Sequence, residues 1–198
     1  MGKLVLVLGA QGVGKSVVIQ EAIKKVKEQY ITVNFGDVVS EIIREKGIGN
    51  DRDKFRREAK LDFFKEIQLE AARRIAEMTK EKNVIITSHA VMYRKSGFFP
   101  GFPSYLLEIL KPVAIVIIYS KPDEIEARRR RDREAGKELD RTRDTVPMEI
   151  IKQEQEYSIY ITFAYAMFTG CCVKIIENPE GRLESAVDEL VDALENLD

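Results

Sequence analysis

The feature that most constrains the fold is a glycine-rich segment near the N-terminus, Gly9-Ala10-Gln11-Gly12-Val13-Gly14-Lys15-Ser16. It fits the pattern G-x-x-x-x-G-K-[ST] at every fixed position, and loops of this pattern surround nucleotide phosphates. Residues 3–8 before it form a short apolar run typical of a buried strand, and residues 17–28 after it place apolar side chains on one helical face. A glycine-rich turn with a chance lysine is the alternative, but it would explain neither flank. The order strand, loop, helix therefore predicts a phosphate-binding loop.

The chemistry of this loop follows from its residue types. Glycine lets backbone N–H groups turn toward an anion, and the start of the following helix adds positive potential. The amine of Lys15 is expected to reach the β and γ phosphates, and the hydroxyl of Ser16 is the predicted ligand of Mg²⁺. The predicted ATP-binding residues are Gly9, Ala10, Gln11, Gly12, Val13, Gly14, Lys15, Ser16 and Val17.

Length and charge exclude several classes of protein. The chain has 198 residues and a formal net charge of −1. That length suits one sizeable α/β core, and the near-neutral charge creates no global field favouring nucleic acid or an anionic membrane. The longest aliphatic stretch, residues 113–118, is too short to cross a bilayer. Because the first strand starts at once, no room is left for a signal peptide, and we expect a cytoplasmic protein.

The cysteines and the histidine predict no metal centre made of protein side chains. Cys171 and Cys172 are neighbours, which disfavours an unstrained disulfide, and their apolar surroundings predict thiols within the core. His89 is the only histidine, and there is no C-x-x-C motif.

Strand and helix signals alternate along the chain, which predicts an α/β fold with a five-stranded parallel sheet and helices on both faces. Besides the first strand, apolar runs predict strands at 31–35, 83–88, 113–119 and 172–177. A helix capped by Asp37 is expected to end at Gly47. Further helices are expected within 51–82 and at 105–110, from 122 into the basic run near 128, and at 148–169 and 183–194. The glycine-, proline- and aromatic-rich residues 96–103 are expected to form a loop.

Four further motifs accompany the phosphate loop. They are Asn34-Phe35-Gly36-Asp37, then Asp51-Arg52-Asp53-Lys54-Phe55-Arg56, then Ser88-His89-Ala90 followed by Ser96-Gly97-Phe98-Phe99-Pro100-Gly101-Phe102-Pro103, and Arg141-Thr142-Arg143-Asp144. Together they resemble the nucleoside monophosphate kinases of the P-loop superfamily and, more narrowly, the archaeal type of adenylate kinase. The resemblance covers nearly the whole chain.

This resemblance implies a three-layer P-loop kinase fold and Mg²⁺-dependent phosphoryl transfer between ATP and a nucleoside monophosphate, with AMP as the expected acceptor. It implies one domain over residues 1–198, with a core (1–35, 62–127 and 146–198), a segment that binds the nucleoside monophosphate (NMP; 36–61) and a lid (128–145). It also implies a homo-oligomer, specifically a trimer. The near-neutral charge and the lack of a nucleic-acid-binding motif predict no nucleic-acid or membrane partner.

Arginine is suited to drawing two anionic substrates together, because its fork of donors matches phosphate oxygens and keeps its charge. Arg128 and Arg131 lie three residues apart and can share a helical face. We predict that they close over the triphosphate with Arg141 and Arg143. The alternative is a solvated basic face paired with Glu124 and Asp132.

The predicted site for the monophosphate draws on several segments. Arg52 and Arg56 are expected to hold its phosphate, although ion pairs with Asp53 or Glu58 are an equal alternative for either residue. The other predicted residues are Gly36, Asp37, His89, Gly97 and Gly101. Alternatively, Asp37 caps the helix. The alternative for His89 is a structural residue that forms hydrogen bonds near the carboxyl edge of the sheet.

One departure from the family pattern concerns the metal. The family usually carries an aspartate at the end of the third strand, where this chain has Thr87, and a hydroxyl brings no charge to anchoring magnesium. A nucleotide-dependent switch or assembly protein therefore stays open as an alternative, as does a P-loop kinase for another small acceptor such as a sugar or shikimate.

Overall fold

The computed structural model describes residues 2–49, 55, 58–94, 97–135 and 147–197. A five-stranded sheet runs through its centre in the order β2-β3-β1-β6-β7, and every neighbouring pair is parallel. This confirms the predicted parallel sheet. The strands are β1 (Leu4–Leu8), β2 (Tyr30–Asn34), β3 (Asn83–Ser88), β6 (Ala114–Tyr119) and β7 (Cys172–Glu177).

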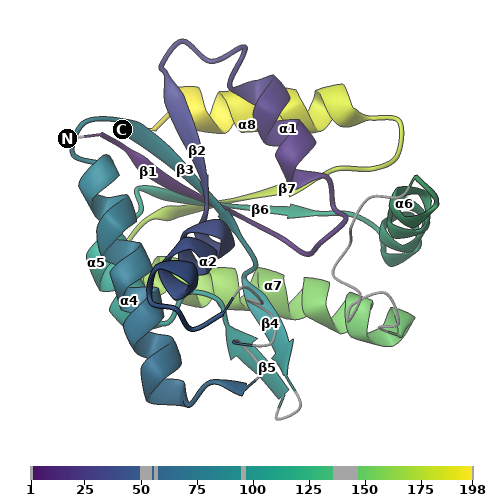
Figure 1. The fold of residues 1–198 in the computed structure, drawn as a ribbon. Coiled ribbons are helices and arrows are strands. Elements are labelled where there is room, and N and C mark those ends of the chain that lie inside the picture. Colours follow the sequence, from purple (N-terminus) through teal and green to yellow (C-terminus); the bar gives the residue numbers. More distant parts are fainter. Residues whose placement is uncertain (1, 50–54, 56–57, 95–96, 136–146, 198) are drawn as a thin grey trace.

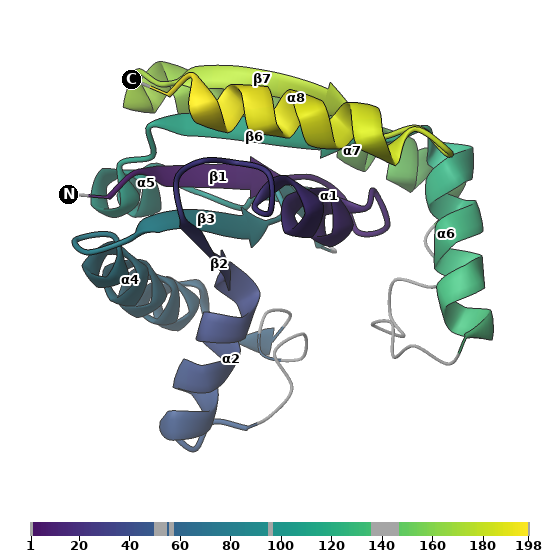
Figure 2. The same cartoon turned by 90° about the horizontal axis from the view of Figure 1, so that it is seen from above.

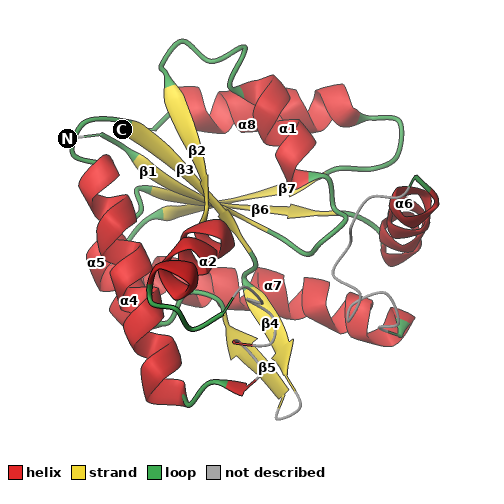
Figure 3. Ribbon diagram, in the orientation of Figure 1, coloured by secondary structure: helices red, strands yellow, loops and turns green. Residues whose placement is uncertain are grey.

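Helices cover both faces of the sheet and make three layers (Figures 1 and 3). One face carries α1 (Lys15–Ala22) and α8 (Leu183–Glu195), and the other carries α4 (Leu61–Met78), α5 (Ser104–Leu110) and α7 (Met148–Thr169). Two further helices, α2 (Phe35–Glu45) and α6 (Pro122–Glu134), follow β2 and β6 beyond the carboxyl ends of the strands. Figure 2 shows them on opposite sides of the phosphate loop.

The central strand β1 divides its side chains between two cores. Leu4, Leu6 and Leu8 pack with α2, α4, α5 and α7, whereas Val5 and Val7 pack with α1 and α8. Alternate side chains of a strand point to opposite faces, and all five are at most 1% exposed. The continuous apolar sequence of β1 thus reflects burial on both faces, which fixes the origin of the phosphate loop at the middle of the sheet.

A two-stranded hairpin replaces part of the loop that the sequence predicts at residues 96–103. β4 (Val91–Arg94) pairs antiparallel with β5 (Gly97–Pro100). The hydroxyl of Tyr165 on α7 donates to the carbonyl oxygen of Ala90 at 2.8 Å and accepts from the amide of Phe102 at 3.1 Å. Contacts across more than sixty residues therefore hold the ends of this hairpin, and the local sequence does not reveal them.

Gly101 closes the hairpin against the chain that precedes β4. Its amide donates to the carbonyl oxygen of Ala90 at 2.7 Å. A Cβ at this position would overlap the carbonyl oxygen of His89. The close approach of two backbone segments therefore requires glycine here.

Two predicted details of the helices are wrong. The cap of α2 is Asn34, whose side-chain oxygen accepts from the amide of Gly36 at 2.9 Å, so the helix begins two residues before Asp37, which lies in its first turn. The first helix is shorter than predicted: α1 ends at Ala22, although Val26 still donates to the Ala22 carbonyl oxygen.

The cysteines are less buried than the sequence predicts. Cys171 is half-buried and Cys172 is exposed, and both are free thiols. The reason is the position of β7, which is an edge strand. An apolar run at a sheet edge resembles one at its centre, because pairing partners are not visible in sequence.

Candidate active site

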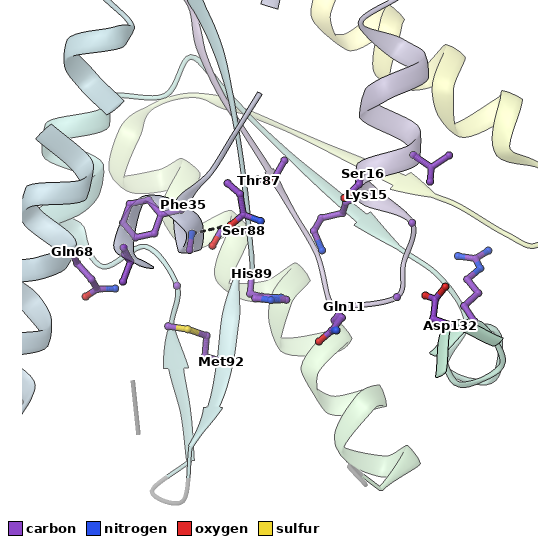
Figure 4. A pocket seen from close by; sticks show the side chains of 18 of the residues that line it. Gln11, Lys15, Ser16, Phe35, Gln68, Thr87, Ser88, His89, Met92 and Asp132 are labelled. Carbon is purple, nitrogen blue, oxygen red and sulfur yellow. Dashed lines mark hydrogen bonds between the residues drawn. The ribbon is translucent and has the colours of Figure 1, made fainter. Parts of the chain in front are cut away.

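A cavity of about 920 Å³ opens at the carboxyl edge of the sheet, where ligands bind in parallel α/β folds. The phosphate loop and α6 form one side of it, and α2, α4 and the start of the β4–β5 hairpin form the other. Figure 4 shows Lys15, Gln11 and Asp132 on the first side and Phe35, Gln68 and Met92 on the second. The lining residues are Gln11, Gly12, Gly14, Lys15, Ser16, Val17, Asn34, Phe35, Gly36, Val39, Phe64, Gln68, Thr87, Ser88, His89, Met92, Gly101, Arg128, Arg131, Asp132 and Ala135.

Side chains from other elements hold the carbonyl groups of the phosphate loop. The carbonyl oxygen of Gln11 accepts from Nε and Nη2 of Arg129 at 3.1 and 2.8 Å. That of Val13 accepts from Nδ2 of Asn178 at 2.8 Å and from Nη1 of Arg128 at 3.2 Å. In a planar trans peptide the C=O and the next N–H point in opposite directions. At these two peptides, the N–H groups that follow Gln11 and Val13 are thereby turned away from the donors.

The carbonyl groups at the start of the loop contact Lys15 of the loop itself and His89, both of which line the cavity. Nζ of Lys15 donates to the carbonyl oxygens of Gly9 and Ala10 at 2.7 and 2.8 Å. Nδ1 of His89 lies 3.1 Å from the carbonyl oxygen of Gly9. Since a carbonyl oxygen only accepts, this contact assigns the proton to Nδ1. His89 thus contacts the phosphate loop and lines the cavity at the same time.

Gly14 shows why this loop requires glycine. Its φ is +87°, in the left-handed region, and a Cβ there would overlap the Nδ2 atom of Asn178. Asn178 is 4% exposed and follows β7, so the close approach joins the loop to the far edge of the sheet.

The four consecutive arginines on α6, Arg128 to Arg131, have different surroundings. Arg128 and Arg131 line the cavity and share one carboxylate, with Nε of Arg128 3.1 Å and Nη2 of Arg131 2.9 Å from the two oxygens of Glu180. Hydrogen bonds from these arginines lower the pKa of Glu180 below its usual value. Arg129 is buried against the phosphate loop, whereas Arg130 is exposed and lies 4.0 Å from Glu134.

Three residues were not identified from the sequence, namely Glu180, Arg129 and Asn178. The alternative interpretation of the basic run paired it with Glu124 and Asp132, whereas Arg128 pairs with Glu180, which lies 52 residues away along the chain. No local signal distinguishes Arg129 from its neighbours in a run of four arginines. Asn178 directly follows the strand predicted at 172–177, and a polar residue at the carboxyl end of a strand was the available signal.

The predicted acceptor residues lie in different places. Gly36, His89 and Gly101 line the cavity. Asp37 and Gly97 are not among its lining residues. Gly97 is the first residue of β5. Four predicted residues lie outside the part of the chain that the structure describes, namely Arg52, Arg56, Arg141 and Arg143.

An apolar compartment with one buried amide was also missed. Phe35, Val39, Phe64 and Met92 line the part of the cavity beside α2 and α4, together with Gln68. On α4, Gln68 occupies the buried face with Phe64 and Ile67. A glutamine within an apolar stripe was the signal that could have identified it.

At the start of α1 and the end of β3, the side-chain oxygen atoms that line the cavity belong to hydroxyl groups. Ser16 is exposed to the cavity, and Thr87 and Ser88 line it from the end of β3. Within the described ranges, no group of three or more His, Cys, Asp or Glu residues is able to hold a metal ion. Mg²⁺ prefers oxygen ligands and keeps waters and phosphates around it. These residues therefore fit an ion that is carried mainly by a nucleotide.

None of the described helices is both long enough and apolar enough to serve as a membrane span.

Comparison with solved structures shows the fold. A shikimate kinase from Bacteroides thetaiotaomicron superposes with a TM-score of 0.57, covers 98% of both chains and is 18% identical in sequence. At that identity the likeness concerns the arrangement of strands and helices alone.

Comparison with other sequences shows the family. Residues 8–146 match a family model described as an AAA domain. An adenylate kinase of Methanopyrus kandleri is 41% identical over 198 residues, with 100% of each chain covered. An adenylate kinase of Methanoculleus marisnigri is 36% identical over 197 residues, covering 98% of this chain and 99% of the other. Together with the phosphate loop and the cavity beside it, these full-length similarities show that the chain belongs to the adenylate kinase family.

Proposed function

We propose that this cavity transfers the terminal phosphoryl group of ATP to AMP, reversibly and with Mg²⁺, to give two molecules of ADP. The observation that carries the proposal is one continuous cavity with a phosphate loop on one side and an apolar compartment beside α2 on the other. Full-length similarity to adenylate kinases supports the same activity.

The donor triphosphate is assigned to the loop of Gly9–Val17. The amides that follow the held carbonyls of Gln11 and Val13 donate to phosphate oxygens. Lys15 exchanges the carbonyl oxygens of Gly9 and Ala10 for the β and γ phosphates, where its charge follows the moving group. Ser16 would hold Mg²⁺, which supplies charge neutralisation between phosphate oxygens when it is bound with the nucleotide.

The arginines are assigned to the charge that spreads over the transferred group. Arg131 exchanges Glu180 for a phosphate oxygen, since its side chain is half exposed and lines the cavity. Arg128 holds the loop through Val13 and exchanges the same carboxylate. Arg141 and Arg143 stay predicted members of this set, and residues 128–145 stay the predicted lid.

The acceptor is assigned to the compartment beside α2, with Gly36, His89 and Gly101 at its border. Arg52 and Arg56, in the predicted NMP-binding segment 36–61, stay the predicted partners of the monophosphate's phosphate. Closure of both segments would exclude water, which otherwise competes as acceptor of the phosphoryl group.

The direct test supplies the purified protein with ATP, Mg²⁺ and one monophosphate at a time, and follows diphosphate formation. AMP is expected to be consumed, and the Lys15→Ala variant provides the background rate. Shikimate and gluconate in place of a monophosphate test the alternative of another small acceptor. A folded protein that binds ATP but phosphorylates no monophosphate contradicts the proposal, and slow ATP hydrolysis alone favours a switch or assembly protein.

We also propose self-association, as a trimer, through the outer face of α7. Tyr160, Phe163, Met167 and Phe168 are 49–88% exposed on this helix, and Ile175 on edge strand β7 is 37% exposed. Exposed apolar patches of this kind mark interaction sites, and copies of the same chain are the occupant that we propose. Light scattering after size exclusion is expected to give three times 22.7 kDa, and Met167→Glu is expected to give the monomer. A monomeric wild type contradicts the trimer.

A cytoplasmic location stays a prediction.

A further inference from the structure

Gln68 is a buried amide that uses one of its four hydrogen-bonding positions within the described part of the chain. It lies on α4, is 2% exposed and lines the cavity. The hydroxyl of Tyr105 on α5 donates to its Oε1 atom at 2.8 Å. Among the described residues, Nε2 has no hydrogen-bond partner. Leaving a buried donor unpaired destabilises a fold, so an arrangement of this kind needs a reason.

The unpaired Nε2 atom faces the cavity. Figure 4 shows the amide nitrogen of Gln68 on the side of the open space, toward Met92 and His89. The surrounding walls are Phe35, Val39 and Phe64, which offer no acceptor in their side chains. A ligand in this compartment is therefore the available partner for both N–H groups.

Tyr105 fixes which end of the amide faces the ligand. Burial raises the pKa of Tyr105, so its hydroxyl keeps the proton that it donates to Oε1. Since Oε1 is held on the side of α5, Nε2 is held on the side of the cavity. A carbonyl oxygen has two lone pairs, and one of them stays available beside Nε2. The amide thus presents a donor and an acceptor next to each other.

We propose that Gln68 determines the base of the acceptor nucleotide, which deepens the proposed function and rests on it. Nε2 donates to a ring nitrogen of adenine, and the remaining lone pair of Oε1 accepts from the exocyclic amino group. Glutamine pairs with adenine in this bidentate manner because the two groups have complementary polarity. A base that carries an oxygen in place of this amino group is disfavoured, because its oxygen and Oε1 of Gln68 are both acceptors and would face each other.

The apolar neighbours give this pairing its strength. Phe35, Val39 and Phe64 are each 5% exposed, so apolar side chains surround the buried amide of Gln68. A hydrogen bond in such surroundings discriminates well, because the wrong base leaves buried groups unpaired. One bidentate pair discriminates by about ten- to a hundredfold.

The test compares kcat/KM for AMP, for IMP and for purine riboside 5′-monophosphate, which carry an amino group, an oxygen and a hydrogen at the same ring position. The wild type is expected to prefer AMP to the other two by about ten- to a hundredfold. Gln68→Met keeps the volume and removes both polar atoms, so kcat/KM for AMP falls toward that for IMP. KM for ATP stays unchanged, because the donor site is on the other side of the cavity.

Two companion variants separate specificity from folding. Gln20→Met makes the same change at an exposed position of α1. It is expected to leave the ratios of kcat/KM among the three monophosphates unchanged. Tyr105→Phe keeps Gln68 but releases its Oε1, so it lowers the AMP to IMP ratio by a smaller factor. Thermal unfolding of each variant reports on its folding.

The outcomes are distinct. An active wild type that uses AMP and IMP equally overturns the role of Gln68 and leaves phosphoryl transfer standing. So does a folded Gln68→Met variant with the wild-type AMP to IMP ratio. A wild type that phosphorylates no monophosphate overturns the proposed function and this inference together.

Discussion

The guanidinium group of Arg129 donates two hydrogen bonds to the carbonyl oxygen of Gln11, from Nε at 3.1 Å and from Nη2 at 2.8 Å. Arg129 is 6% exposed, so a buried charge is used to orient one peptide of the phosphate loop. Its neighbour Arg130 on α6 is exposed and lies near Glu134 only at the limit of an ion pair. Two adjacent arginines therefore have opposite roles, one within the site and one on the surface.

Arg129→Met is expected to lower kcat/KM for ATP by about a hundredfold, the effect of misplacing a catalytic loop by about 1 Å. Methionine retains most of the apolar volume but leaves the Gln11 carbonyl oxygen without its donors. Arg130→Met removes the same charge from the same helix and is the matched control. Steady-state kinetics with varied ATP checks the prediction, and equal rates for the two variants would contradict it.

Lys15→Ala is expected to lower kcat by about 10²–10³-fold, comparable to the loss of one strong electrostatic donor. Lys24→Ala removes an exposed amine that pairs only with Glu21 within the described contacts, and it is expected to have the wild-type rate. Initial rates at saturating substrates test both. A Lys15→Ala rate close to that of Lys24→Ala excludes the assigned role.

Gly101→Ala is expected to lower the free energy of unfolding by about 1–3 kcal/mol, the range typical of overpacking. The new methyl group would meet the carbonyl oxygen of His89, a backbone atom that moves only with the hairpin. At Gly97 nothing lies within 4 Å of an added Cβ, so Gly97→Ala adds backbone strain without an overlap. Urea unfolding compares the two, and a smaller loss at Gly101 than at Gly97 disproves the close contact.

Thr87→Asp is expected to lower the Mg²⁺ concentration needed for half-maximal activity, because a carboxylate at the end of β3 adds charge to a site that offers hydroxyls. Thr32→Asp on β2 introduces the same side chain at an exposed position and serves as the control. Rates measured against free Mg²⁺ check this prediction. If both variants keep the wild-type dependence on Mg²⁺, the missing carboxylate has no bearing on metal use.

The sequence predicts the core of the fold well where burial is continuous. The long helix α7 and the strand β7 have the predicted bounds, and the alternation of strands and helices predicts the parallel sheet. The strands are easy to recognise in the sequence because a strand that is buried on both faces is apolar along nearly its whole length. Cys172 shows the limit of this argument, since the position of β7 at the sheet edge depends on strand order and leaves that thiol exposed.

The phosphate loop is predicted from sequence because its residues are contiguous, whereas the residues that orient it are not. Asn178 and Glu180 reach the loop and α6 from beyond β7, through the tertiary fold. The predicted cap of α2 was wrong for a different reason. Asn34 and Asp37 are both good capping residues, and only the backbone conformation shows which of them precedes the helix. Gln68 carries a weak signal, one polar residue on a buried helical face.

The strand order β2-β3-β1-β6-β7 has a kinetic consequence. Because β1 lies in the middle, the segment after β2 and the segment after β6 approach the phosphate loop from opposite flanks (Figure 2). If the donor binds at the phosphate loop and the acceptor binds beside α2, as we propose, neither nucleotide has to pass the other to reach its place. The architecture favours substrate addition without a compulsory order, which product-inhibition patterns can distinguish from an ordered sequence.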